Sequence, residues 1–199
     1  MSRSSEQKKH VQTVFSRELA QIGDEALREK VVLCWVRAMD MSGAGDLAAD
    51  IPSLKKITRL KGRQHGAGLE HIKAVVRFAE VIADAQQDAH GLKPNRDIVI
   101  AGALLHDVGK LLEQAPADRN ALAGKLVRHA FSGVHVAMLE GVPAEVMHVI
   151  AYHAAEGHRV PRTLECHIVY TADILSVDAL ERRELGEAIP AAYIYVPED

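Results

Sequence analysis

Apolar residues recur every three or four positions along most of this chain, a spacing that predicts α-helices. Ser4 or Ser5 can cap the first predicted helix, Gly23 follows its end, and Asp24 can cap the second. Pro143 and Pro161 are expected in the first turns of two later helices. The helices predicted from this spacing cover approximately residues 4–22, 24–39, 69–89, 97–110, a short segment reaching 129 and continuing over 131–139, then 144–155 and 161 onward.

The segment DIVIAGALLHDVGK, residues 97–110, differs from the others because its first part has no polar face. Its residues from Ile98 to Leu105 are apolar or glycine, so a helix here must be surrounded by protein. His106 and Asp107 follow at the end of this run, where burial is costly unless each group is hydrogen-bonded, charge-paired or bound to a metal. The sequence therefore predicts a central buried helix with chemistry at its end.

Composition narrows the fold class. The chain has 199 residues, of which 48% are hydrophobic and only 4% aromatic, and alanine, leucine and valine favour closely packed helices. We expect one compact all-α domain with short appended segments. The net charge of -3 provides no general basic field, so we do not expect nucleic acid as a partner.

The chain also lacks signals for a membrane or for secretion. No segment approaches the length of a membrane span, and the N-terminus has no apolar leader, so we expect a cytoplasmic protein that does not bind a membrane. In that setting Cys34 and Cys166 are expected to be reduced, buried thiols.

Eleven histidines make metal or acid-base chemistry a central question. Several polar side chains occupy positions where the surrounding pattern is apolar. Any one of them alone is more often a hydrogen-bonded core residue than a ligand. Four imidazoles and two carboxylates would converge only if a cation compensated them. These candidates are His71, His106, Asp107, His129, His153 and Asp173.

The ordered series H, HD, H, H and D, with the pair written LLHDVGK, resembles the HD-domain superfamily of metal-dependent phosphohydrolases. The resemblance extends from EHIKAVV around His71 to TADILS around Asp173. It implies an all-α helical bundle with the metal site at its centre. The segment IAYHAAEG lacks the second histidine of the HD-GYP phosphodiesterases and the GYP signature is missing, so hydrolysis of cyclic-di-GMP is not supported.

The resemblance implies two divalent transition-metal ions. By analogy one ion would be held by His71, His106, Asp107 and Asp173, and Asp107 would bridge to a second ion on His129 and His153. Mixed imidazole and carboxylate ligands suit iron, manganese, cobalt, nickel or zinc without choosing among them. Asp107 is the expected catalytic bridge. Lys110 can neutralise a substrate phosphate, or can simply be a cation at a helix end.

Three functions remain open from the sequence. We expect a hydrolase that uses a metal-activated water to cleave a phosphate ester or phosphodiester of a small, anionic, nucleotide-like substrate. The alternative is a mixed-valence di-iron oxygenase, since some HD-domain proteins with the same ligand set have that chemistry. The third is a regulatory module without catalysis, which a complete ligand set argues against.

The chain is divided here into three parts. Residues 1–66 are predicted to be N-terminal helices and a basic loop packing on the core, residues 67–182 the HD domain, and residues 183–199 a tail. The basic loop contains Lys55, Lys56, Arg59, Lys61 and Arg63 and is either a substrate-binding element or a solvated surface. His65 beside it is a candidate for the mouth of the site. The tyrosine-bearing tail is compatible with a homodimer.

Overall fold

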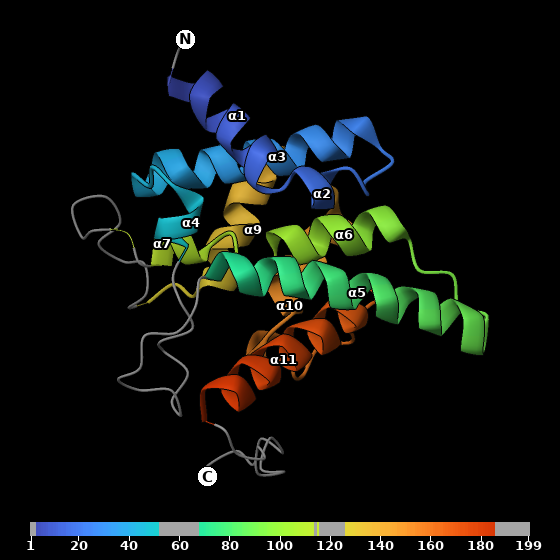
Figure 1. Ribbon diagram of the computed structural model, residues 1–199. Coiled ribbons are helices and arrows are strands. Elements are labelled where there is room, and N and C mark those ends of the chain that lie inside the picture. The colour runs from blue at the N-terminus through green and yellow to red at the C-terminus, as the bar shows by residue number, and fades with distance from the viewer. Residues whose placement is uncertain (1–2, 52–67, 114, 116–125, 186–199) are drawn as a thin grey trace.

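A computed structural model describes residues 3–51, 68–113, 115 and 126–185. Every regular element within these ranges is a helix, which confirms the predicted all-α class (Figure 1). The helices are α1 (Arg3–Val14), α2 (Ser16–Leu19), α3 (Glu25–Ser42), α4 (Leu47–Asp50), α5 (Gly68–His90), α6 (Arg96–Leu105), α7 (Lys110–Glu113), α9 (His129–Leu139), α10 (Ala144–Tyr152), the 3₁₀ turn η3 (Ala155–Gly157) and α11 (Leu164–Leu185).

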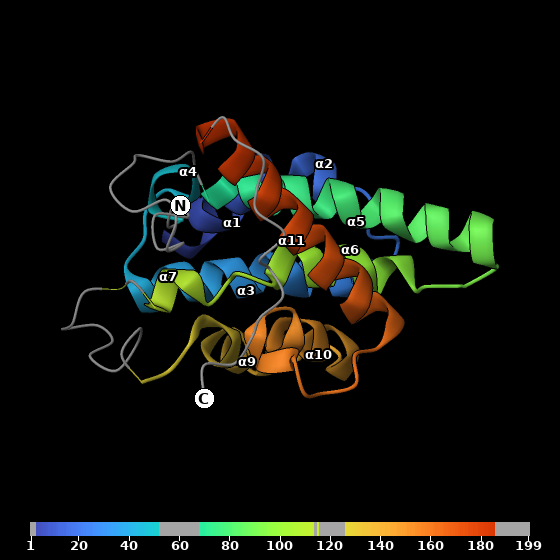
Figure 2. The same ribbon diagram turned by 90° about the horizontal axis from the view of Figure 1, so that it is seen from below.

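Helix α6 occupies the middle of the bundle. Helices α5 and α11 pack beside it and beside each other, α10 packs against another side and in turn against α9, and α3 covers a third side (Figures 1 and 2). All residues from Ile98 to Leu105 are buried, as the absence of a polar face predicted. The helix begins where the side chain of Asn95 accepts hydrogen bonds from the amides of Asp97 and Ile98.

The N-terminal helices join the same hydrophobic core. The single helix predicted over residues 4–22 is wrong, because α1 ends at Val14 and Phe15 leaves helical geometry before α2 begins. The Phe15 ring packs on Trp35 of α3 with 5.3 Å between ring centroids. The loop after α2 is fixed to α6, since the amides of Gly23 and Asp24 each donate to the Asp97 carboxylate over 2.8 Å.

The central helix predicted within residues 97–110 ends at Leu105, so His106 and Asp107 follow directly at its end, as predicted. Residues 106–109 form a turn, and α7 then begins at Lys110. The turn packs very closely on α9, because a Cβ atom added to Gly109 would lie 2.0 Å from the carbonyl oxygen of His129. Only glycine fits this contact without a shift of backbone.

Three further helix ends differ from the predictions. His129 is the first residue of α9, whereas the pattern placed it at the end of a short helix. Helix α10 ends at Tyr152, before the predicted residue 155. Helix α11 begins at Leu164, three residues after Pro161, where the hydroxyl of Thr163 accepts a hydrogen bond from the amide of Cys166.

Cys34 and Cys166 are both buried and free, as predicted. Burial raises the pKa of Cys34 to about 12 and that of Cys166 to about 11, so both thiols stay protonated near neutral pH. The structure places neither thiol among the candidate metal ligands.

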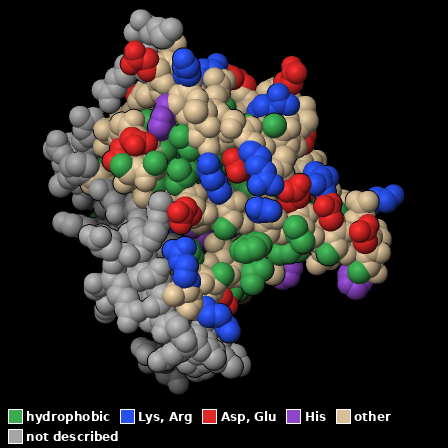
Figure 3. Space-filling view, viewed as in Figure 1, with side chains coloured by type: hydrophobic (Ala, Val, Ile, Leu, Met, Phe, Trp, Pro, Cys, Tyr) green, Lys and Arg blue, Asp and Glu red, His purple; other side chains and the backbone are tan. Residues whose placement is uncertain are grey.

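The molecular surface carries both signs of charge. On the face drawn in Figure 3, described Lys and Arg side chains are interspersed with Asp and Glu. Within the described ranges, no helix is long and apolar enough to cross a bilayer. The basic loop, His65 and the tail from residue 186 lie outside the described residues.

Candidate metal centre

The structure brings all six predicted ligand residues together at the middle of the bundle. The ligand atoms of His71, His106 and Asp173 all lie within 4.8 Å of one another. The same limit holds for a second group formed by Asp107, His129 and His153. Five separate segments supply these side chains, namely α5, the turn after α6, the start of α9, the end of α10 and the middle of α11.

The first group faces α5 and α11. Nε2 of His71 lies 3.0 Å from Oδ1 of Asp173 and 3.4 Å from Nε2 of His106. Both histidines are fully buried, whereas the Asp173 side chain is 18% exposed. This exposure places the carboxylate on the side of the group that solvent can reach.

The second group faces α9 and α10. Nε2 of His129 and Nε2 of His153 lie 3.4 Å apart. They approach Oδ1 of Asp107 at 3.4 Å and 3.8 Å respectively. The other oxygen of that carboxylate, Oδ2, lies 3.3 Å from Nε2 of His106 and 3.7 Å from Nε2 of His71. Asp107 therefore presents one oxygen to each histidine pair.

Lys110 is the nearest cation to this carboxylate within the described part of the chain. Its Nζ lies 2.5 Å from Oδ2 of Asp107, and its side chain is 22% exposed. Burial works against the charge on the ammonium, but Asp107 and then Asp173 outweigh it and raise the pKa of Lys110. Lys110 is thus a permanent positive charge at the edge of the first group.

The four imidazoles turn Nε2 inward and occupy Nδ1 with partners outside the groups. His106 and His153 each follow the end of a helix, and each uses Nδ1 to donate to the carbonyl oxygen three residues earlier, at Ala103 (2.7 Å) and Ile150 (2.9 Å). His71 and His129 lie in the first turns of their helices and use side chains instead. Their partners are Ser176 Oγ at 2.9 Å and Glu113 Oε2 at 3.0 Å.

These partners determine where the lone pairs point. Carbonyl and carboxylate oxygens only accept hydrogen bonds, so a neutral His129 or His153 carries its proton on Nδ1 and a bare lone pair on Nε2. The two lone pairs face each other and Oδ1 of Asp107, and none of the three atoms offers a proton to the others. Such a buried cluster of acceptors is unfavourable unless a cation binds it. The residues present therefore fit a divalent metal ion.

Electrostatics within the groups agree with this arrangement. Burial, and next the positive charge of nearby His106, lower the pKa of His153 to about 3, so its imidazole is neutral at physiological pH. Burial alone would raise the pKa of Asp107, but Lys110 and His106 hold it well below its usual value. Burial likewise opposes ionisation of Asp173, yet the hydrogen bond from His71 lowers its pKa to about 2. Neutral imidazoles and ionised carboxylates are the forms that bind metals.

His106 shows the opposite tendency. Burial disfavours its protonation, but the adjacent Asp107 outweighs burial and the pKa of His106 is raised. Binding of a divalent ion would displace this proton, as expected for histidine ligands.

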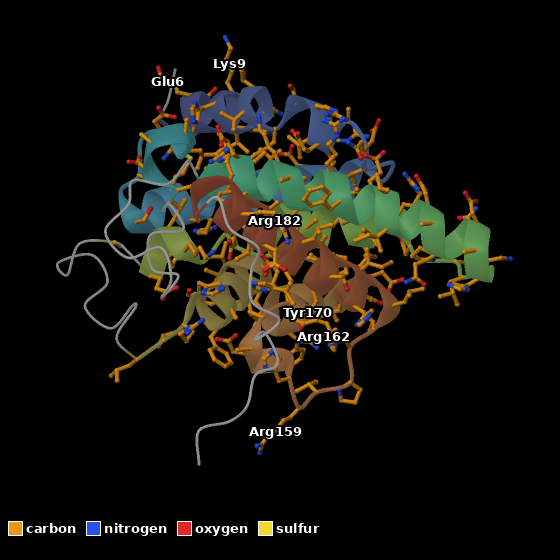
Figure 4. The ribbon with its side chains drawn as sticks, turned by 60° about the horizontal axis from the view of Figure 1, so that its bottom comes forward. Glu6, Lys9, Arg159, Arg162, Tyr170 and Arg182 are labelled. Atoms are coloured by element: carbon orange, nitrogen blue, oxygen red, sulfur yellow. The ribbon has the colours of Figure 1, made fainter. Side chains whose placement is uncertain are left out.

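Several supporting residues were not found from the sequence. Arg162 donates to the carbonyls of Tyr152 and Ala154, on either side of His153, and its guanidinium lies 3.9 Å from the ring centroid of Tyr170 on α11 (Figure 4). Ser176 and Glu113 were missed as well. Ser176 lies 105 positions along the chain from His71, and Glu113 lies 16 positions from His129. Helical spacing does not predict contacts over such separations.

Two further histidines, His135 and His148, belong to neither group. Nε2 of His148 accepts a hydrogen bond from the amide of Thr163 over 3.3 Å, and His135 is exposed on α9. Both are accounted for without a ligand role.

Comparison with known proteins gives two matches. Residues 68–178 match the family described as the HD domain. The chain is also similar to the dihydroneopterin 2',3'-cyclic phosphate phosphodiesterase of Methanocaldococcus jannaschii, with 29% identity over 160 residues, 77% of this chain and 64% of that protein. The chain thus aligns with a little under two thirds of its relative's length. No solved structure matches the sequence significantly.

Proposed function

Because this chain belongs to the HD domain family, we propose that it is a metal-dependent phosphodiesterase acting on a small, nucleotide-like phosphate compound. The observation that carries the proposal is the Asp107 carboxylate, with one oxygen facing His71 and His106 and the other facing His129 and His153. Two ions are expected, one on each side, with Asp173 completing the first set. The relative's activity supports phosphodiester chemistry and gives no support to the oxygenase alternative.

When bound, the divalent ions would supply Lewis acidity, which activates water and neutralises charge on a phosphoryl group. The chain's own residues have separate parts. Four imidazoles and two carboxylates would hold the ions in a buried setting where little water competes. Lys110, partly exposed beside Asp107, places a positive charge where a substrate phosphate would enter.

A cyclic phosphodiester is the substrate class to test first, because that is the compound named for the relative. Its hydrolysis consumes one water. A new phosphorus–oxygen bond forms, one ring phosphorus–oxygen bond breaks, and the leaving alkoxide takes a proton. That proton comes from the water, and the other water proton is released to solvent near neutral pH, since the second pKa of a phosphate monoester is about 6. The monoester product then carries one more negative charge than the cyclic substrate, and Lys110 can pair with it.

The test uses metal-stripped protein reloaded separately with Mn²⁺, Fe²⁺, Co²⁺, Ni²⁺ or Zn²⁺. Dihydroneopterin 2',3'-cyclic phosphate, nucleoside 2',3'-cyclic phosphates and the matching monoesters are incubated with each form, and products are separated by chromatography. Hydrolysis of a cyclic phosphate is expected. No hydrolysis by any two-metal form would contradict the proposal, as would dioxygen consumption by the iron form without phosphate-ester cleavage.

Asp107→Ala is the informative variant of this experiment. Removing the shared carboxylate should abolish binding of both metals and lower the turnover rate by roughly a thousandfold or more. Asp88→Ala on the exposed end of α5 removes the same charge far from the site and should keep both properties. If elemental analysis finds two metals per chain in Asp107→Ala, the bridging assignment is wrong.

A further inference from the structure

In the second group, Nδ1 of His129 contacts a residue that is not among the six candidate ligands. His129 opens α9, so no preceding turn of its own helix offers a carbonyl for Nδ1. His106 and His153, which follow the ends of helices, receive such a carbonyl from three residues earlier. The partner of His129 comes instead from α7, where Glu113 Oε2 lies 3.0 Å from Nδ1.

From this contact we infer that Glu113 is a positioning residue that fixes the proton of His129 on Nδ1 and thereby creates the second metal site. This inference rests on the proposed function, because it takes His129 to be a ligand. A carboxylate only accepts, so His129 must donate from Nδ1 and keep the Nε2 lone pair free for a metal. The contact is shielded from solvent, since only 7% of the His129 side chain and 14% of the Glu113 side chain are exposed.

Without this acceptor, the tautomer of His129 that carries its proton on Nε2 would be favoured. Moving its proton to Nε2 would let it donate to Oδ1 of Asp107 at 3.4 Å or to Nε2 of His153 at 3.4 Å. That internal hydrogen bond would satisfy the acceptor cluster without any ion. Glu113 therefore removes the arrangement that competes with metal binding.

Glu113 also balances charge between the two groups. The first group contains Asp173 in addition to its share of Asp107, whereas the second has only its share of Asp107. The carboxylate of Glu113 adds negative charge one hydrogen bond away from the second site, as carboxylates behind metal-binding histidines commonly do. The second site should depend on Glu113 much more than the first.

The test measures the tautomer and the metal separately. Glu113→Met keeps the length of the side chain and its helix preference but removes the acceptor, and Glu113→Gln keeps an acceptor oxygen without the charge. Imidazole ¹⁵N chemical shifts of the metal-free proteins report the tautomer of His129. Titration with Co²⁺, followed by visible absorption and equilibrium dialysis, reports the affinity of each site.

In the wild type, and in Glu113→Gln, His129 should carry its proton on Nδ1, and two Co²⁺ ions should bind. In Glu113→Met the proton should move to Nε2. The first Co²⁺ should bind to Glu113→Met as tightly as to the wild type, and the second should bind about 10- to 100-fold more weakly. Glu145→Gln, an exposed charge change on α10, is the matched control and should bind like the wild type. Glu113→Ala serves if methionine is not accommodated.

The inference is overturned if wild-type His129 carries its proton on Nε2, or if Glu113→Met binds two Co²⁺ ions as tightly as the wild type. Equal loss of both ions would overturn it too, since that result indicates a general structural role. Failure of the wild type to bind a second Co²⁺ would instead contradict the proposed ligand set. The tautomer of His129 would still decide the role of Glu113 in that case.

Discussion

At the scale of single residues, the centre is defined by which atom of each side chain faces inward. The four histidines are chemically alike, yet their positions relative to helix ends give them different partners. His106 and His153 receive carbonyls from their own helices, whereas His71 and His129 depend on Ser176 and Glu113 from other helices. Orientation is therefore secured locally for two of these candidate ligands and by tertiary contacts for the other two.

His153 gives a prediction about pH. Its pKa of about 3 in the folded chain lies below the value of about 6.5 for a free histidine. As the pH falls below 6.5, the unfolded chain gains a proton that the folded chain cannot accept. The free energy of unfolding of the metal-free protein should therefore fall by about 1.4 kcal/mol per pH unit from this residue, or about 2 kcal/mol between pH 6.5 and 5.

Urea unfolding of wild type and His153→Gln at pH 7 and pH 5 measures this contribution. Glutamine does not titrate, so the variant escapes this loss. Between pH 7 and pH 5, the wild type should lose about 2 kcal/mol more free energy of unfolding than His153→Gln. The raised pKa of His106 acts in the other direction, because its stabilisation is lost as the pH rises, but both proteins contain it. If the free energy of unfolding changed equally with pH in the wild type and His153→Gln, His153 would be protonated in the folded chain and the prediction would be wrong.

At the scale of helices, the candidate metal centre is assembled where the ends of several helices meet. The turn after α6 and the start of α9 touch backbone to backbone at Gly109 and His129. This contact leaves no room for a side chain, and it fixes the distance between Asp107 and His129. The packing of two chain segments thus sets the geometry of the second group.

Gly109→Ala should for this reason destabilise the fold by about 1 to 3 kcal/mol or more and displace His129. Thermal unfolding monitored by circular dichroism measures the loss. Gly45→Ala is a matched control, since a Cβ there meets nothing within 4 Å, and its effect should stay within about 1 kcal/mol. Equal stability of both variants would mean that the close contact at Gly109 relaxes freely.

The sequence predicted helices better than it predicted where they end. Apolar spacing located α3, α5 and α10, because burial of one face imposes that period, and an unbroken apolar run located α6. The spacing did not locate the break at Phe15, whose ring packs on the distant Trp35, or the start of α11, where the Thr163 hydroxyl accepts a hydrogen bond from the Cys166 amide. The six ligand candidates were recognised because charged or imidazole groups interrupt apolar runs. Their supporting residues were missed because Glu113 and Ser176 look like ordinary helix residues.

At the scale of the whole molecule, the N-terminal helices and the helices around the candidate metal centre share one hydrophobic core. Helix α6 connects them. Its first turn carries Asp97, which accepts the amides of Gly23 and Asp24, and its other end leads directly into His106 and Asp107. We expect the chain to unfold as one cooperative unit.

Asp97→Ala tests this connection. Loss of two hydrogen bonds to a charged group in a partly exposed position should cost about 1 to 2 kcal/mol. Fluorescence of Trp35, the single tryptophan, reports on α3, and far-ultraviolet circular dichroism reports on all helices. Both signals should move together to lower urea in Asp97→Ala and stay unchanged in Asp88→Ala. Separate transitions for the two signals would show that the N-terminal helices unfold independently.

The burial of α6 has a consequence for exchange of amide hydrogens with solvent deuterium. The apolar side chains from Val99 to Leu105 are at most 2% exposed, and neighbouring helices cover them on several sides. Their amides can meet water only when the surrounding bundle opens, so their exchange follows global unfolding and not local fluctuation. A peptide from this helix, followed by mass spectrometry, would report the stability of the entire chain in mixtures where the protein is never purified.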